Sequence, residues 1–162
     1  MSAQLWVRNL RTTKGVYTPH AQRADLVYGE LSPLPDGEGL LRAYAGDRVV
    51  VASAGSQPRT VNPLAIAVMR EVGIDISQQR SKHLNKYLLH PFDCVITVCD
   101  RAAEACPLFP GPAQRIHWSF DNPAAAAGTT EDRLTTFRQV RDEIAQLLKA
   151  FAAALPDPAA PM

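Results

Sequence analysis

Residues 92–100 read Phe-Asp-Cys-Val-Ile-Thr-Val-Cys-Asp. Within them, Cys94 to Cys99 form a mostly apolar, β-branched run with the length of a strand. Such a run is typical of a strand that is covered on both faces, as in a parallel sheet. Val49 to Ala52 is a second run of this kind, and Arg115 to Trp118 is a short third. These runs predict a buried sheet.

Helix signals separate the predicted strands. Asn62 can cap a helix that begins at Pro63, and Gly73 can end it. Thr129 and Asp132 fit a capping box at the start of the last helix. Apolar steps of three and four residues predict one buried stripe on each helix, namely Leu64, Ala67, Val68 and Val72 on the first, and Leu134, Phe137, Val140, Ile144, Leu147 and Phe151 on the second.

Alternating strands and helices predict an α/β, three-layer fold, in which a four-stranded parallel sheet is flanked by helices. Ligands of such sheets bind at the carboxyl ends of the strands. Residues 1–37 lack this order and offer only Leu26-Val27-Tyr28 as a stub of strand. We therefore expect a disordered or aberrant segment at 1–37, a folded domain at 38–155 and a flexible tail at 156–162.

Composition excludes several classes of function. The chain has 162 residues, a net charge of +1 and scattered basic residues, which gives no electrostatic case for binding nucleic acid or a membrane surface. No apolar run is long enough to span a bilayer, and Met1 to Gly15 lack the apolar region of a secretory signal. We expect a soluble, cytoplasmic monomer.

The chain contains three cysteines, Cys94, Cys99 and Cys106. An odd, small number argues against a disulfide framework and for redox or buried roles. Free cysteines are often small buried residues, and we expect this of Cys94, which lies inside a strand. A zinc site is disfavoured because no C-x2-C pair is present.

From Glu38 to about Phe151 the chain resembles the thioredoxin-coupled arsenate reductases, which share the fold of the low-molecular-weight tyrosine phosphatases. Seven motifs in order carry the resemblance: Ser53-Ala54-Gly55, Asn62-Pro63-Leu64-Ala65, Gly73-Ile74-Asp75-Ile76-Ser77, Phe92 to Asp100, Glu104-Ala105-Cys106-Pro107, His117 to Ala124, and Arg138 to Glu143. The match implies a two-electron reduction of arsenate to arsenite, with no bound cofactor and with thioredoxin as the external reductant.

The resemblance also implies the roles of two cysteines. A loop cysteine attacks the oxyanion, Cys99 attacks that cysteine and releases arsenite, and Cys106 then forms a disulfide with Cys99 for thioredoxin to reduce. The alternative for Cys99 and Cys106 is two inert buried residues.

The family's nucleophile lies in a C-x5-R loop between the first strand and first helix, where backbone amides and the arginine hold a tetrahedral oxyanion. This chain contains no C-x5-R. Codons permitted for His20 to Gly37, read one base later, can encode V-L-I-L-C-T-G-N-S-P-R-S-Q-M-A and then join Glu38 in the written frame. We hypothesise that a one-base loss near Gly37 put residues 1–37 in the wrong frame.

Other positions that match the family are weaker evidence of function. Asn122 lies where the family has an aspartate that acts as general acid, which an amide cannot do; Asp121 lies one residue early, and the alternative for both is a turn. Glu38, Ser53 and Asp75 match positions that bind potassium in some members of the family. The alternative for all three is a purely structural role, as a helix-start acid, a turn hydroxyl and a loop acid respectively. His83 and Lys82 are expected to be surface residues, and His117 a structural histidine.

Without the loop, we expect the chain as written neither to reduce arsenate nor to hydrolyse phosphomonoesters. Two alternatives stay open. One is a low-molecular-weight phosphatase, against which Cys99 and Cys106 count because dephosphorylation needs no further thiols. The other is a non-catalytic interaction protein on the same scaffold, which the absent nucleophile and Asn122 favour.

Overall fold

The computed structural model describes residues 2–9, 36–55, 60–80, 82–87, 89, 92, 94–100 and 114–155. The strands and helices of this part of the chain are, in order, β1 (Ser2–Asn9), α1 (Asp36–Ala45), the 3-10 turn η1 (Gly46–Arg48), β2 (Val49–Gly55), α2 (Pro63–Glu71), η2 (Leu84–Lys86), β3 (Cys94–Asp100), β4 (Gln114–Phe120), η3 (Pro123–Ala125) and α3 (Thr130–Ala154).

The strands form one sheet in the order β2-β1-β3-β4. β3 and β4 are parallel, whereas β1 is antiparallel to both β2 and β3. β2, β3 and β4 therefore run in one direction, as the sequence predicts, and β1 is the exception. The sequence analysis also expected no such strand before Glu38. An antiparallel strand in the centre still pairs the backbone groups of both of its neighbours.

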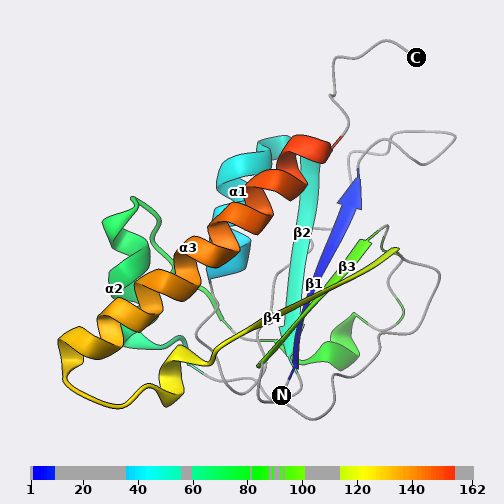
Figure 1. Cartoon of the computed structure of the whole chain (residues 1–162). Helices are drawn as coiled ribbons and strands as arrows, with labels where there is room; N and C mark the ends of the chain where they lie inside the picture. The colour runs from blue at the N-terminus through cyan, green and yellow to red at the C-terminus, as the bar shows by residue number, and fades with distance from the viewer. Residues whose placement is uncertain are drawn as a thin grey trace, which may run out of the picture.

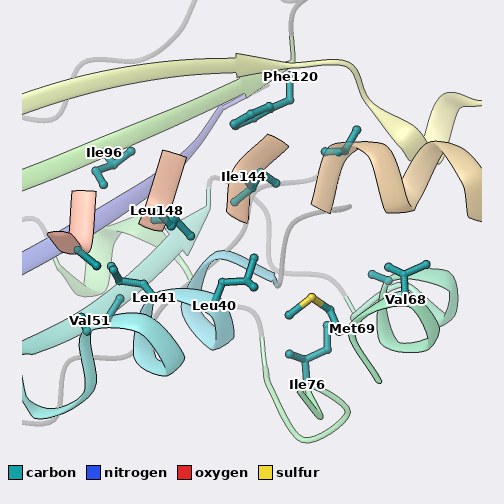
Figure 2. Packing of buried hydrophobic residues seen from close by; sticks show 14 of the residues in the cluster. Leu40, Leu41, Val51, Val68, Met69, Ile76, Ile96, Phe120, Ile144 and Leu148 are labelled. Carbon is teal, nitrogen blue, oxygen red and sulfur yellow. The ribbon is translucent and has the colours of Figure 1, made fainter. Parts of the chain in front are cut away.

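The helices α1, α2 and α3 lie on one side of the sheet, with α3 running across α1 and α2 (Figure 1). Between the helices and the sheet is the main hydrophobic cluster, which Figure 2 shows from close by. This cluster contains Ile96 of β3 together with Leu40 and Leu41 from α1, Met69 from α2 and Leu148 from α3, and each is at most 2 % exposed. Because these side chains come from every layer, their burial holds the helices on the sheet.

The opposite face of the sheet is also covered at its centre. Ala54 of β2 is 0 % exposed and Val95 of β3 is 1 % exposed, yet neither belongs to the main cluster. Both alternate with residues that do, such as Val51 and Ile96, so they lie on the other face. The α/β fold with helices packed on a buried sheet agrees with the prediction. The helical layer on the second face stays a prediction, because the α-helices of the described residues lie on one side of the sheet (Figure 1).

The predicted helix caps are confirmed. The Asn62 side chain accepts a hydrogen bond from the amide of Leu64, with Pro63 in the first turn. Thr129 and Asp132 form the capping box of α3, with the Thr129 amide donating to Asp132 at 2.8 Å. Gly73 follows α2 with a φ of 79°, a conformation that glycine adopts without strain.

The predicted stripes are partly wrong. On α2, Val68 is buried, but Val72 is 47 % exposed and Met69 is buried instead. On α3, Phe137, Val140 and Ile144 are buried as predicted, whereas Leu147 is 38 % exposed and its neighbour Leu148 is fully buried.

Three expectations fall outside the described residues. Leu26 to Tyr28 and the tail at 156–162 lie there, as does most of the segment at 1–37. The division into 1–37, 38–155 and 156–162 therefore stays a prediction. Across the described residues, no helix has both the length and the apolar character that a bilayer span requires.

Candidate functional site

The carboxyl ends of three strands meet at one edge of the sheet. β2 ends at Gly55, β3 at Asp100 and β4 at Phe120, and Asp100 pairs with Phe120. β1 brings its amino end to this edge, where Ser2 pairs with Cys99 and Ala3 with Gly55. We call this the carboxyl edge of the sheet, and ligands of parallel sheets bind there.

The structure places the backbone of Cys99 on β3, one residue before the strand ends, beside Ser119 of β4. Cys106 lies outside the described residues, so the Cys99–Cys106 pairing stays a prediction. Cys94 is a free cysteine in the main cluster and is 6 % exposed. The expectation that Cys94 is a core residue is confirmed.

Asn122 lies two residues after the end of β4, at the carboxyl edge. Its side-chain oxygen accepts a hydrogen bond from the amide of Ala124 at 3.0 Å, and it caps η3, in which Pro123 is buried. The turn interpretation of Asp121-Asn122-Pro123 is thus confirmed. Asp121 is exposed. The structure gives Asn122 a local structural role, and an amide supplies no proton there.

The three residues considered for potassium have different surroundings. Glu38, on α1, is 4 % exposed and forms an ion pair with Arg42. Asp75 is exposed and accepts a hydrogen bond from the amide of Ser77 at 2.9 Å, which lowers the pKa of its carboxyl. Ser53 lies on β2, and its side chain is outside the described part of the chain. The potassium site therefore stays a prediction.

Lys82 and His83 lie beside the carboxyl end of β2. The Gly55 amide donates to the Lys82 carbonyl at 3.1 Å, and Gly55 forms a parallel bridge with His83. Burial, followed by the charge of Lys86, lowers the pKa of the Lys82 ammonium to about 8. Lys82 is thus half-buried at the carboxyl edge instead of a plain surface residue as predicted.

Tyr87 follows η2 and is 3 % exposed. Burial, followed by the charge of Glu38, raises the pKa of its hydroxyl to about 12, so the hydroxyl stays protonated at neutral pH. Sequence reasoning missed this residue, because a single tyrosine after Lys86 belongs to no periodic pattern from which its burial could have been predicted.

Sequence reasoning also missed Arg141, which is 8 % exposed. Its Nη1 donates to the Val68 carbonyl at 2.7 Å and to Glu71 at 3.1 Å. Val68 is among the last four residues of α2, whose carbonyls have no partner within the helix. Arg141 of α3 therefore completes the cap of α2. Its position beside Val140, inside the apolar stripe, was the one available signal.

Comparison with known proteins places these features in a family. Residues 32–159 match the family described as low molecular weight phosphotyrosine protein phosphatase. The arsenate reductase of Halalkalibacterium halodurans is 47 % identical over 115 residues, which are 71 % of this chain and 83 % of the relative. The chain belongs to the low-molecular-weight phosphotyrosine protein phosphatase family.

Solved structures agree with the fold of this phosphatase family. An arsenate reductase in an oxidized state superposes with a TM-score of 0.66 at 25 % identity and covers 83 % of this chain and 100 % of its own. A thioredoxin-dependent arsenate reductase of Corynebacterium glutamicum gives a TM-score of 0.59 at 23 % identity, covering 85 % of this chain and 64 % of its own. The family match begins at residue 32, so it leaves out most of the segment that the sequence analysis set apart.

Proposed function

We propose that this chain is an arsenate-reductase-like protein of the cytoplasm, in which Cys99 and Cys106 are the resolving pair of a cysteine relay. The observation that carries the proposal is the place of Cys99 at the carboxyl edge of the sheet, together with the relatives named arsenate reductase. In the relay, two thiols are oxidised to one disulfide, and the two electrons and two protons that they lose reduce arsenate to arsenite and water. The dithiol of thioredoxin then reduces the disulfide.

As written, the chain lacks the first nucleophile of that relay. No C-x5-R is present, so the chain has no cysteine within a loop of that motif, and we expect no attack on arsenic or phosphorus. The direction of β1 supports this. The carboxyl end of β1, Asn9, pairs with Val49 at the start of β2, and the segment after β1 therefore begins at the edge away from Cys99.

Oxidation of the reduced protein tests the resolving pair. Mild oxidant is expected to form a Cys99–Cys106 disulfide, identified by peptide mass spectrometry, that thioredoxin reverses. Cys99→Ser and Cys106→Ser should each abolish it, whereas the matched control Cys94→Ala should leave it intact because Cys94 is buried in the core. Two thiols that stay reduced under these conditions would refute the proposal.

A turnover assay tests the missing nucleophile. The purified 162-residue chain is expected to give no arsenite from arsenate and no hydrolysis of p-nitrophenyl phosphate. The gene with the reading frame restored upstream of Glu38 should give a protein with a C-x5-R loop and arsenate-dependent oxidation of thioredoxin. A coding sequence without a cysteine codon in the shifted frame contradicts the frame hypothesis.

A second candidate is a non-catalytic interaction protein, and one observation favours it. Asn122 already caps η3 through Ala124, so the general-acid position has a structural role. If Cys99 and Cys106 prove inert while the purified chain is monomeric and folds cooperatively, this candidate replaces the relay.

A further inference from the structure

β4 lies at one end of the strand order, so one side of it is an edge of the sheet. In the order β2-β1-β3-β4 it pairs with β3, and no further strand follows it within the described part of the chain. An edge strand presents backbone amides and carbonyls that can pair with another strand. Proteins often protect such edges with very short strands or with proline, but β4 has seven residues and contains no proline.

The side chains of β4 leave both faces of this edge accessible. Arg115, His117 and Ser119 are exposed on one face, where His117 Nε2 lies 3.0 Å from Ser119 Oγ. On the other face, Ile116 and Trp118 pack against the main cluster but are only partly buried. A neighbouring strand would cover the remaining apolar surface of these two side chains, and such burial favours association.

A second copy of β4, laid antiparallel along this edge, has a register that suits its side chains. When Trp118 lies opposite Trp118 of the second copy, Arg115 lies opposite Asp121, the residue that follows β4. In the same register Ile116 lies opposite Phe120. Opposite charges and aromatic or β-branched pairs are favourable across two strands. The edge is therefore complementary to itself.

The neighbouring symmetric registers lose the charge pair. A centre at His117 puts Arg115 opposite Ser119, and a centre at Ser119 puts Arg115 opposite Pro123, which has no amide proton to donate. Arg115 and Asp121 each have a further interaction within their own chain. They can keep it, because a guanidinium has five donors and a carboxylate has about four acceptor sites.

We propose that a second copy of this chain docks on β4, antiparallel and centred on Trp118, and joins two four-stranded sheets into one. The same surface of both copies forms such an interface. The two carboxyl edges then point in opposite directions, so the inference is independent of the cysteine relay. Because an edge contact buries little area, the protein should be monomeric at low micromolar concentration and dimeric near millimolar concentration.

Sedimentation equilibrium of the full chain over this concentration range tests the proposal through charge reversal. Arg115→Asp and Asp121→Arg each turn two attractive cross-strand pairs into two repulsive ones, so each should weaken dimerisation about tenfold. The variant with both reversals restores opposite charges and should recover the parent affinity. Arg80→Asp is the matched control and should dimerise like the parent, because Arg80 is exposed and precedes the segment that borders β2, the other edge strand.

Carbodiimide coupling tests the register separately. In Arg115→Lys, the new amine should couple to Asp121 of the second copy, which a mixture of heavy and light isotopic forms identifies as a link between two chains. Positions 115 and 121 are about 20 Å apart along one extended strand, too far to be coupled directly within a single chain. Circular dichroism spectra and urea midpoints equal to those of the parent should accompany these exposed substitutions.

Four results overturn the proposal. They are a parent that stays monomeric at millimolar concentration, a dimer that Arg115→Asp does not weaken, a doubly reversed variant that stays weak, and coupling in Arg115→Lys that never joins two chains. Hydrogen exchange identifies a different occupant of the edge. If the β4 amides that point away from β3 are protected in a protein that stays monomeric, a segment of the same chain fills the edge, and the proposal is wrong.

Discussion

Replacing Arg141 with methionine removes a buried guanidinium that links the end of α2 to the middle of α3. Arg141 is 8 % exposed, and its Nη1 donates to the Val68 carbonyl at 2.7 Å and to Glu71 at 3.1 Å. Its Nε donates to Asp142 at 2.8 Å. Methionine keeps the length of the apolar stem, so Arg141→Met tests the guanidinium and not the packing.

The expected loss follows from these contacts. A hydrogen bond from a charged donor contributes about 1.5–3 kcal/mol, and its removal leaves the Val68 carbonyl without that donor. The carboxylates of Glu71 and Asp142 are 40 % and 59 % exposed, so their ion pairs add at most about 1 kcal/mol. We expect Arg141→Met to lower the free energy of unfolding by about 2–3 kcal/mol, or to lower Tm by roughly 6–9 °C for a chain of this size.

Urea denaturation followed by circular dichroism measures the change, and Arg138→Met is the matched control. Arg138 donates to the same carboxylate, Glu71, and to Glu131, but its side chain is 33 % exposed. Its hydrogen bonds are the main cause of the lowered pKa of Glu71. Within the described part of the chain, Arg138 donates to the carboxylates of Glu71 and Glu131 and to no helix carbonyl. Arg138→Met should therefore cost clearly less. If it costs as much as Arg141→Met, the capping of α2 is not the source of the stability.

Three further changes have defined outcomes. Hydrogen bonds from Thr129 lower the pKa of the Asp132 carboxyl below its unfolded value, so the ionised carboxylate stabilises the fold above about pH 4, and this stabilisation is lost as the pH falls through the folded pKa. Asp132→Asn should therefore flatten the acid side of a plot of unfolding free energy against pH, and an unchanged plot contradicts this. A Cβ on Gly39 would lie 2.8 Å from Ile74 Cγ2, so Gly39→Ala should lower the free energy of unfolding by about 1–3 kcal/mol through overpacking. The loss from Gly39→Ala should be smaller in a protein that already carries Ile74→Ala, and urea denaturation that shows simply additive losses would contradict the clash. Burial, followed by the charge of Lys86, lowers the pKa of Lys82 to about 8, so acylation of its amine, measured on the Lys82 peptide, should have a pH midpoint near 8. Lys86→Met should raise this midpoint, and an unchanged midpoint shows that Lys86 does not lower the pKa of Lys82.

Local signals predicted the local structure well. The caps of α2 and α3 depend on residues two or three positions apart, Asn62 with Leu64 and Thr129 with Asp132, so they could be identified from spacing alone. The buried strand around Ile96 has the composition of a strand covered on both faces. These elements depend on no distant partner.

Which side chains are buried could not be predicted where burial depends on packing against a distant part of the chain. Residues 64–69 of α2 are all apolar, so periodicity cannot tell which side meets α3, and the structure buries Met69 where Val72 was expected. Leu147 and Leu148 are identical neighbours, and only packing against the sheet selects Leu148. Arg141 is buried because of a carbonyl 73 positions away, which no local pattern reports.

The direction of β1 was the least predictable feature and has the largest consequence for function. The sequence analysis overlooked that Ala3, Leu5 and Val7 alternate with larger or polar residues, as in a strand. Even with that alternation recognised, it contains no information on direction. In the structure β1 fills the centre of the sheet with its amino end at the carboxyl edge, since Ser2 pairs with Cys99. A loop can cradle an oxyanion near Cys99 only if it starts at that edge, as a parallel central strand would require. The centre of the described sheet is therefore filled by a strand that does not lead into such a loop. The reading-frame hypothesis accordingly predicts that the restored protein has a central strand that runs in the direction of β2 and β3.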